Sequence, residues 1–542
     1  MRGRGVEVSK TLFYCEERGE TTMGLEARLL GRTKIYTDET IIDEDNILSV
    51  LRKAYAKHLF NRRQMQFLID YEGGQQPLKR QKIVRPDIDI KVNGSVANYV
   101  KEFKIGYNWS SPIMLVQRGD KEMHGSDSKT DDAGITSLNE ILTNGENIGY
   151  KDQCMAEFIE ICGIGHRMID IKTDFDDMED GEPESLVDVY TLDSRYAFCV
   201  YNNGTGQKKV LGVTYRKVSG KLYFTCFTKE YRYEIQSGEV VSVEKNPLKD
   251  IPIIEYERSF DRTGCFERKI PEIDALNILM SDFTNDVSQR TQEIWWGNDI
   301  KFPVDEKGDE IQPKSGQWLV TYSNENGKPS VQPLSSTFDS GSTLSAISDY
   351  RSRIFQDCKV PIQYESSGSG STGTATDMSS GWSAAELDAM REQQMTEKGK
   401  REEIKLILRA IQLVPSKILP EDSPIRKIHS SDIDFHFNRR KNYDMSVKAN
   451  TFATYVSHGI HGRHALKVVD AFGDVEQVWN DSQEMIEKYQ ESLWKTSDSS
   501  STSTIGDTGS NTSEKIQGDT SDQTGNSPIL DGLNTDSNKI QA

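Results

Sequence analysis

Apolar residues recur at helical spacing in three parts of the first 165 residues. Residues 43–70 carry such a pattern behind an acidic start, which suits a helix N-terminus. The stretch SVANYVKEF predicts a second helix that ends near Gly106, and a third is predicted from about Ile135 to Cys162. From Met168 to Glu257 the pattern changes to alternation, with Val, Tyr, Phe and Thr separated by N-G and S-G turns. This predicts an antiparallel sheet, so the first half is expected to be an α+β domain.

The second half is mostly helical. One seam of apolar positions steps by three, four or seven residues, a spacing typical of helices that pack on helices; it comprises Ile273, Leu276, Met280, Phe283, Val287 and Ile294. A second stripe comprises Leu344, Ile347, Ile354 and Cys358. Between them an insert with turn dipeptides predicts two strands, and one long helix is predicted over about 383–413. A strand, SDIDFHFNR, and short helices follow.

A stretch of small, flexible residues interrupts this helical half. Residues 364–382 read YESSGSGSTGTATDMSSGW, between the second stripe and the long helix. A linker between independent domains is one interpretation. A loop inside a single helical unit is the other, because the flanking segments look like one unit that has been interrupted.

Composition narrows the class of protein. The segment 496–542 is rich in Ser, Thr, Asp, Gly and Asn and is predicted to be disordered. No apolar run approaches the roughly 20 residues of a membrane span, and the N-terminus lacks the apolar core of a signal peptide, so a cytoplasm-like compartment and no membrane partner are expected. Seven scattered cysteines without a C-x-x-C pair indicate reduced thiols. A net charge of −19 argues against a general basic grip on nucleic acid, though not against letting DNA pass.

Candidate chemical motifs are weak. The acidic run at 174–184 fails the EF-hand pattern, because Met178 and Val187 fall at ligand positions. Three histidines lie three residues apart, at His458, His461 and His464, where a turn between helices is favoured over a metal site. Short basic clusters at 61–64, 77–85 and 437–443 are interpreted as surface or subunit-contact charge.

Enzyme motifs are missing as well. The sequence contains no Walker A motif, no G-x-S-x-G elbow and no dinucleotide-binding fingerprint. We therefore predict no catalytic residue, no metal site and no cofactor.

Several stretches, in this order and spacing, resemble the portal proteins of tailed bacteriophages, of the siphovirus type found in phages and prophages of Gram-positive bacteria. They are FLIDYEGGQQPLKRQK, NGSVANYVKEFKIGYNWSSPI, the block NPLKDIPIIEYERSFDRTGCFERKIPEIDALNILMSDFTNDVSQ, and FHFNRRKNYD with VSHGIHGRHAL and DAFGD. The resemblance covers about residues 43–494. HGIHGRHAL departs from it, because relatives more often carry a Ser-containing helix start there.

The resemblance implies an α+β portal fold, assembled as a ring that is typically twelve-fold. Its expected parts are an N-terminal arm (1–42), an α+β wing (43–269), a stem helix (270–297), a clip (298–337), a second stem helix (338–359), a tunnel loop (360–381), a long helix (382–414), a crown (415–494) and a disordered tail (495–542). Implied site residues are the tunnel-loop residues Gly368, Ser369, Gly370, Ser371, Thr372, Gly373 and Gly381, the stem seam from Ile273 to Ile294, and the clip contacts Lys307, Trp318 and Tyr322.

The implied function is a non-enzymatic DNA conduit at the capsid vertex of the virion, for genome packaging, head-to-tail attachment and DNA ejection. Expected partners are further copies of the chain, double-stranded DNA in transit, the terminase motor, a head-completion or adaptor protein, and the major capsid and scaffolding proteins. Alternatives are another virion ring, an adaptor or scaffold protein, or a DNA-processing enzyme.

Overall fold

The computed structural model describes most of the chain between residues 31 and 485. The described residues are 31–78, 86–117, 128–173, 185–290, 295–302, 307, 318–322, 327–333, 340–362, 381–437, 439, 445–469, 478–479, 482–483 and 485. The chain divides into two compact units, Met1–Arg439 and Arg440–Ala542. The boundary falls after the Gly/Ser stretch, so both sides of that stretch belong to the first unit.

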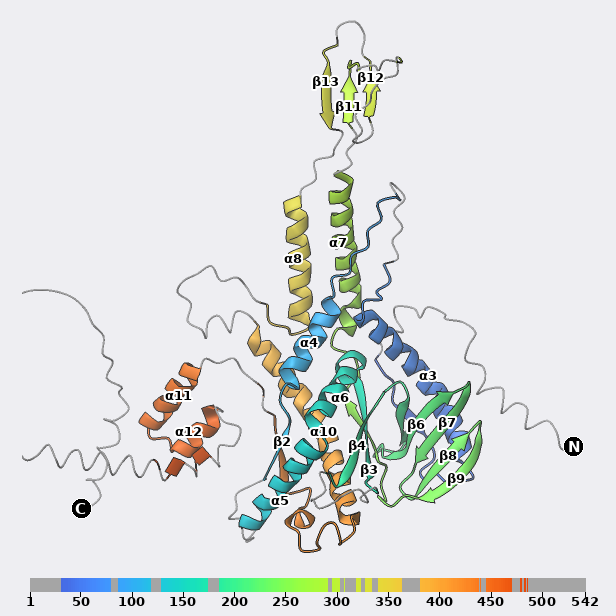
Figure 1. Cartoon of the computed structure of the whole chain (residues 1–542), viewed down its shortest axis with the longest axis vertical. Coiled ribbons are helices and arrows are strands. Elements are labelled where there is room, and N and C mark those ends of the chain that lie inside the picture. The colour runs from blue at the N-terminus through green and yellow to red at the C-terminus, as the bar shows by residue number, and fades with distance from the viewer. Residues whose placement is uncertain are drawn as a thin grey trace, which may run out of the picture. The chain divides into compact units, whose positions relative to one another are not determined.

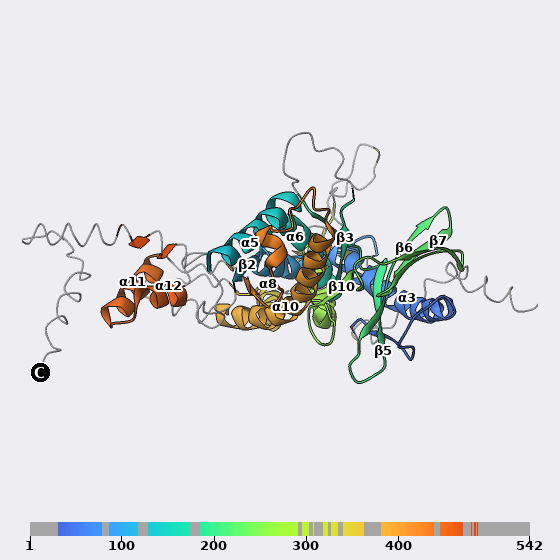
Figure 2. The same ribbon diagram turned by 90° about the horizontal axis from the view of Figure 1, so that it is seen from below.

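A six-stranded sheet forms one part of the first unit (Figure 1). Its order is β1 (Ile35–Thr37), β5 (Ala197–Asn202), β6 (Lys209–Val218), β7 (Lys221–Phe227), β8 (Tyr231–Gln236) and β9 (Glu239–Lys245). Figures 1 and 2 show the helix α3 (Ile47–Glu72) lying along this sheet. The buried ring of Tyr55 packs edge-on against Tyr215 and Phe224, at centroid distances of 5.2 and 5.1 Å. This apolar layer fixes the helix on the sheet.

A second, three-stranded sheet has the order β10 (Ile253–Glu257), β3 (Ile164–Ile171) and β4 (Val187–Leu192). The helices α6 (Ile148–Cys162) and α10 (Trp382–Leu413) pack on it. The helix α4 (Val96–Asn108) packs against α6. A two-stranded pair, β2 (Met114–Gln117) with β14 (Ile433–His436), joins distant parts of the chain.

Two helices, α7 (Ile270–Arg290) and α8 (Ser340–Asp357), pack side by side (Figure 1). The chain between them forms a third sheet in which β11 (Trp295–Asn298) lies between β12 (Trp318–Thr321) and β13 (Ser330–Pro333). The pairing of β11 with β12 is parallel, and that with β13 is antiparallel. In the second unit, α11 (Met445–Ser457) and α12 (Gly462–Val469) pack together.

Several expectations need correction. The single helix expected from 135 to 162 is divided into α5 (Ser128–Glu140), a π-turn (Ile141–Gly145) and α6, because Asn147 adopts a left-handed φ of 50°. The alternating segment forms two sheets rather than one. The two strands expected in the insert are β12 and β13, and they pair with β11, which lies at the start of the insert where the helix was expected to continue. The helix expected to reach 297 ends at Arg290, since Trp295 already pairs in β11.

Two expected boundaries also fall inside continuous structure. β1 lies in the segment assigned to an N-terminal arm, yet it pairs in parallel with β5. A short 3-10 helix (Pro424–Lys427) and β14 lie in the segment assigned to a crown, yet both belong to the first unit. The mixed helix-and-sheet character agrees with the expected α+β class, and the expected long helix is α10.

Candidate functional site

The two ends of the Gly/Ser stretch lie next to each other. Described structure stops after Ile362 and resumes at Gly381. A Cβ atom placed on Gly381 lies 3.9 Å from the Cα of Pro361, which is ordinary van der Waals contact. Gly381 has a φ of 90°, a value that glycine adopts without strain, and it precedes the first turn of α10. The chain thus leaves α8 and enters α10 at one point, which we call the loop base (Pro361 and Gly381).

The α8 side of the loop base is held by apolar packing. Ile354 and Val360 are buried in one hydrophobic cluster with Ile273 and Leu276 of α7. The next residue, Phe355, contacts the ring of Tyr99, with centroids 5.0 Å apart. The end of α8 is therefore fixed to both α7 and α4.

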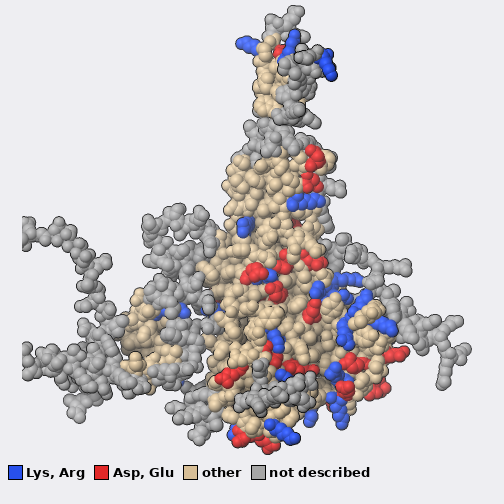
Figure 3. All heavy atoms as spheres, viewed as in Figure 1, with Lys and Arg blue, Asp and Glu red and all other residues tan. Residues whose placement is uncertain are grey.

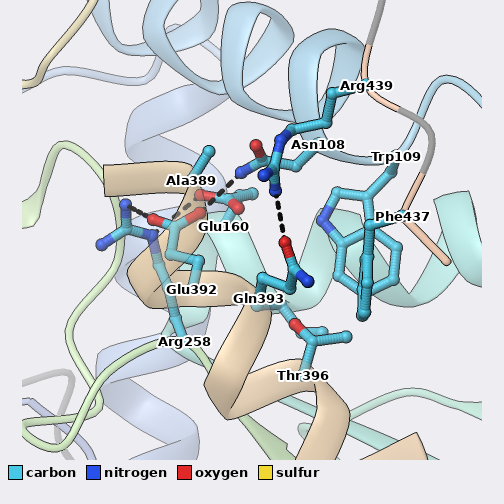
Figure 4. Close-up of a pocket in the computed structure, with 11 residues that line it drawn as sticks. Asn108, Trp109, Glu160, Arg258, Ala389, Glu392, Gln393, Thr396, Phe437 and Arg439 are labelled. Carbon is cyan, nitrogen blue, oxygen red and sulfur yellow. Dashed lines mark hydrogen bonds and ion pairs between the residues drawn. The ribbon is translucent and has the colours of Figure 1, made fainter. Parts of the chain in front are cut away.

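The α10 side is held by charge. Asp388 accepts a 2.5 Å hydrogen bond from the Nζ atom of Lys104, and Glu386 accepts one of 3.1 Å from Arg439. Figure 4 shows Arg258 reaching two carboxylates at once. They are Glu160 of α6, 2.8 Å from its Nε atom, and Glu392 of α10. The first half of α10 is thus fastened to α4, α6 and the chain after β10 by ion pairs.

A second buried cluster follows two to three turns further along α10. Arg167 is 0% exposed and contacts Asp152 at 2.6 Å and Glu403 at 3.1 Å. Lys400 reaches the same Asp152 oxygen at 2.8 Å, and the Tyr256 hydroxyl donates to Glu403. Breaking such a buried pair leaves an uncompensated charge, so these contacts fix α10 strongly on the three-stranded sheet.

The pKa directions agree with this pairing. Burial raises the pKa of Asp388 and Glu403, but nearby cations outweigh it and lower both values: Lys104 for Asp388, and Arg167 with Lys400 for Glu403. Glu392 behaves in the opposite way. Burial and the neighbouring Glu160 carboxylate raise its pKa to about 8, although Arg258 opposes them.

Beyond Glu403 the contacts of α10 become apolar. Ile404, Ile407, Ile411 and Val414 are buried in the cluster that also contains Ile159 of α6. This is the stripe that the sequence pattern predicts. α10 therefore has a charge-fastened first half and an apolar second half.

A polar ladder holds α7 against an extended segment. Three residues of α7, spaced four apart, accept hydrogen bonds through their side chains. The donors are the backbone N–H groups of every second residue in the segment 90–94. The N–H of Gly94 donates to Asn277 Oδ1 at 3.0 Å, that of Val92 to Ser281 Oγ at 2.9 Å, and that of Ile90 to Asn285 Oδ1 at 2.7 Å. Four helical residues rise about 6 Å and two extended residues about 6.6 Å, so the two repeats match.

The predicted site residues fall into three groups. Gly368, Ser369, Gly370, Ser371, Thr372, Gly373 and Ile294 lie outside the described residues, and Gly381 lies at the loop base. Within the seam, Ile273 and Leu276 are fully buried, Met280 and Phe283 are partly buried, and Val287 is 46% exposed. In the third sheet, Trp318 stacks on Trp295 at 6.0 Å, whereas Tyr322 and Lys307 are exposed. The contact roles assigned to these residues stay predictions.

Sequence reasoning missed the charged residues of α10 and the polar ladder. Acidic residues on a long helix resemble a solvated face, and their partners lie up to 284 positions away. The ladder did leave a signal, because Asn277, Ser281 and Asn285 form a stripe at helical spacing.

The described residues offer neither a metal site nor a membrane span. Among the residues that the structure describes, no group of three His, Cys, Asp or Glu side chains is placed to hold a metal ion. His461 lies 6.0 Å from His464 and 5.2 Å from Trp479, as ring centroids. The described helices include none that is long and apolar enough to cross a membrane.

Comparison with known protein families gives a match. The model of a family described as phage portal protein, SPP1 Gp6-like, matches residues 88–492, about three quarters of the chain. The matched range includes the loop base, both ionic clusters and the polar ladder. No curated protein sequence matches the chain.

Proposed function

Because this chain belongs to the phage portal protein family of the SPP1 Gp6-like type, we propose that its copies form a ring around a DNA channel. A phage portal protein is a structural component of the capsid vertex. The finer proposal is that double-stranded DNA passes through this ring during genome packaging and ejection. We propose twelve subunits for the ring and no catalysis by the chain itself, so that a separate terminase ATPase supplies the energy.

The loop base is the observation that supports this proposal best. A linker between independent domains carries the chain from one body to another, whereas here α8 and α10 meet at Pro361 and Gly381 within one compact unit. The chain thus leaves the described structure of the first unit after Ile362 and re-enters it at Gly381, beside the point of departure. We assign to residues 363–380 the tunnel loop that lines the channel. Their small side chains suit close approach to a moving duplex, because each tight phosphate contact would add affinity and slow translocation.

The same proposal assigns α7 and α8 to the stem and the third sheet to the clip. The face of the α7–α8 pair seen in Figure 3 carries few charged side chains, as suits packing between neighbouring subunits. Exposed Tyr322 and Lys307, with Trp318, would offer a contact surface for the packaging motor and later for a head-completion protein. The major capsid and scaffolding proteins are the remaining proposed partners.

Electron microscopy of the purified chain, with its mass in solution, tests ring formation. We expect rings with a central hole and a mass that gives the subunit number. A protein that stays monomeric both alone and with scaffolding protein would contradict the proposal. So would ATP hydrolysis or metal-dependent DNA cleavage by the purified chain, since either would favour a DNA-processing enzyme.

Deleting residues 366–380 tests the role of the loop. We expect rings to assemble, because both sides of the loop base keep their own contacts, and DNA packaging to fall. A matched variant replaces these residues by the same number of Gly and Ser residues and separates loop length from loop sequence. Loss of ring assembly on deletion would count against a channel role.

A further inference from the structure

The helix α3 carries positive charge with no acidic residue among its neighbours in the chain. Residues 46–69 contain five Lys and Arg residues and no Asp or Glu, in a chain whose net charge is −19. Asp and Glu make up 85 of the 542 residues, so a stretch of 24 would carry about four of them. The helix is thus a local exception to the acidic composition of the chain.

Three of these cations lie on one exposed side of α3. They are Lys53, Lys57 and Arg63. Ala56 and Phe60, which lie between them, are exposed as well. Steps of three or four residues place all five positions on one side of an α-helix, over a rise of about 15 Å. The opposite side of α3 is buried against the six-stranded sheet. We call these five residues the basic face.

No carboxylate among the described residues pairs with the basic face. Lys53 and Arg63 form no side-chain hydrogen bond or ion pair with any described residue. Lys57 donates a hydrogen bond of 3.2 Å to the backbone carbonyl of Tyr36, which does not balance its charge. Lys101 of α4 shows the contrast, because its Nζ atom lies within 3.3 Å of three carboxylates. The charge of the basic face is therefore available to a partner.

A polyanion fits this face better than another protein surface does. Lys is depleted in protein–protein interfaces, whereas protein–DNA interfaces carry much more positive charge. Double-stranded DNA has one negative charge per about 1.7 Å of its axis, so about nine phosphates lie along about 15 Å of duplex. Cations that are unpaired in the free protein give up no ion pair on binding, so each phosphate contact adds its full contribution to the affinity.

We propose that the basic face binds double-stranded DNA without sequence preference, through contacts of Lys53, Lys57 and Arg63 with backbone phosphates. Contacts of this kind carry no sequence information. Each contact releases counterions, so the logarithm of the binding constant falls with the logarithm of the salt concentration by about 0.9 per contact, or about 2.7 for three. That DNA lies beside α3 in the virion rests on the proposed function, whereas the affinity of the basic face for DNA does not.

Binding of the purified full-length chain to a relaxed, closed-circular plasmid at about 50–200 mM KCl tests the proposal. A closed circle cannot thread a preassembled ring, so it reports contacts outside a channel. For the basic-face variant, which combines Lys53→Gln, Lys57→Gln and Arg63→Gln, we expect weaker binding and a salt slope smaller by about 2.7. Across this fourfold range of salt, the wild type then loses about 40-fold more affinity than the variant does.

Two further variants separate the basic face from the effect of net charge. A control variant combines Lys221→Gln, Lys229→Gln and Lys249→Gln, which removes the same three charges from exposed positions at or near the six-stranded sheet. We expect it to keep the wild-type salt slope. Ala56→Lys adds a cation to the basic face and should increase the slope by about 0.9. A folding defect does not produce such a gain in binding.

Three results would overturn the proposal. One is a basic-face variant that binds the plasmid as the wild type does, or that loses no more affinity than the control variant. Another is displacement of the plasmid by poly-L-glutamate as efficiently as by free duplex at equal charge, which would favour an acidic polypeptide as the partner. The third is a wild type that does not bind the closed circle; if it still binds linear duplex, the proposed channel stays intact. Conversely, plasmid binding through the basic face without ring formation would contradict the proposed function alone.

Discussion

Two helical glycines predict opposite effects of the same substitution. Glycine inside a helix is less favourable than alanine by about 1 kcal/mol, so Gly→Ala normally stabilises. Gly399 lies in α10 with no room for a methyl group, since an added Cβ would lie 2.4 Å from Cε1 and 2.5 Å from Cδ1 of Tyr256. Gly106 lies in α4 with nothing within 4 Å of the same position. Both substitutions thus gain the same helix propensity, and they differ in whether the added methyl group has room.

The magnitude follows from how little Tyr256 can move. Its ring is 1% exposed, and its hydroxyl donates to Glu403 inside the second ionic cluster. Overpacking of a rigid core lowers the free energy of unfolding by about 1–3 kcal/mol. Cβ atoms essentially never lie within 3.0 Å of another heavy atom, and the added Cβ would be 0.6 Å closer than that, so we expect Gly399→Ala in the upper part of this range. After subtracting the propensity gain, we expect a net loss of about 1–2 kcal/mol, against a gain of up to about 1 kcal/mol for Gly106→Ala.

Thermal unfolding of both variants, in the same assembly state as the wild type, measures the difference. At about 2 °C per kcal/mol, Gly399→Ala lowers Tm by about 2–4 °C and Gly106→Ala raises it by up to about 2 °C. Hydrogen exchange then locates the loss in β10 and the middle of α10. Equal Tm shifts of the same sign would refute the reasoning, because they would show that Tyr256 yields to the added methyl group.

Further predictions concern the ionic clusters and the polar ladder. Arg167→Met leaves Asp152 and Glu403 buried without their arginine and is expected to cost about 3–5 kcal/mol in urea unfolding. Arg268→Met, which removes an exposed pair with Asp261, should cost less than about 1 kcal/mol, and equal costs would contradict the role of burial. Because pairing lowers the pKa of Glu403, its contribution to stability is lost as pH falls through that lowered value; Glu403→Gln should therefore flatten the acid side of a Tm–pH curve, and an unchanged curve would count against it. Asn285→Ala removes one rung of the ladder and should cost about 1–2 kcal/mol, with faster hydrogen exchange in 88–94, whereas Val287→Ala on the exposed side of α7 should leave that segment unchanged.

Local pattern accounts for the elements that the sequence predicts well. The buried stripe Ile404, Ile407 and Ile411 was readable as a helix face, because an apolar residue every three to four positions can be buried in only one way. Alternation likewise indicated the strands between 168 and 257. It did not show that these strands form two sheets, since strand order depends on contacts between distant segments.

The sequence by itself thus determined the helix and strand content, the interruption before α10 and the resemblance to phage portal proteins. Tertiary structure alone decided what the interruption is and what the charges of α10 do. Pro361 and Gly381 are 20 positions apart, and only packing of α8 and α10 on a shared core brings them into contact. Lys104 and Asp388 are 284 positions apart, and Asp388 belongs to a pattern that indicates a solvated helix face until the fold half-buries it beside Lys104. The physical reason is that the partner of a charged residue depends on the tertiary structure, whereas the spacing of apolar residues along the sequence already indicates which helix face is buried.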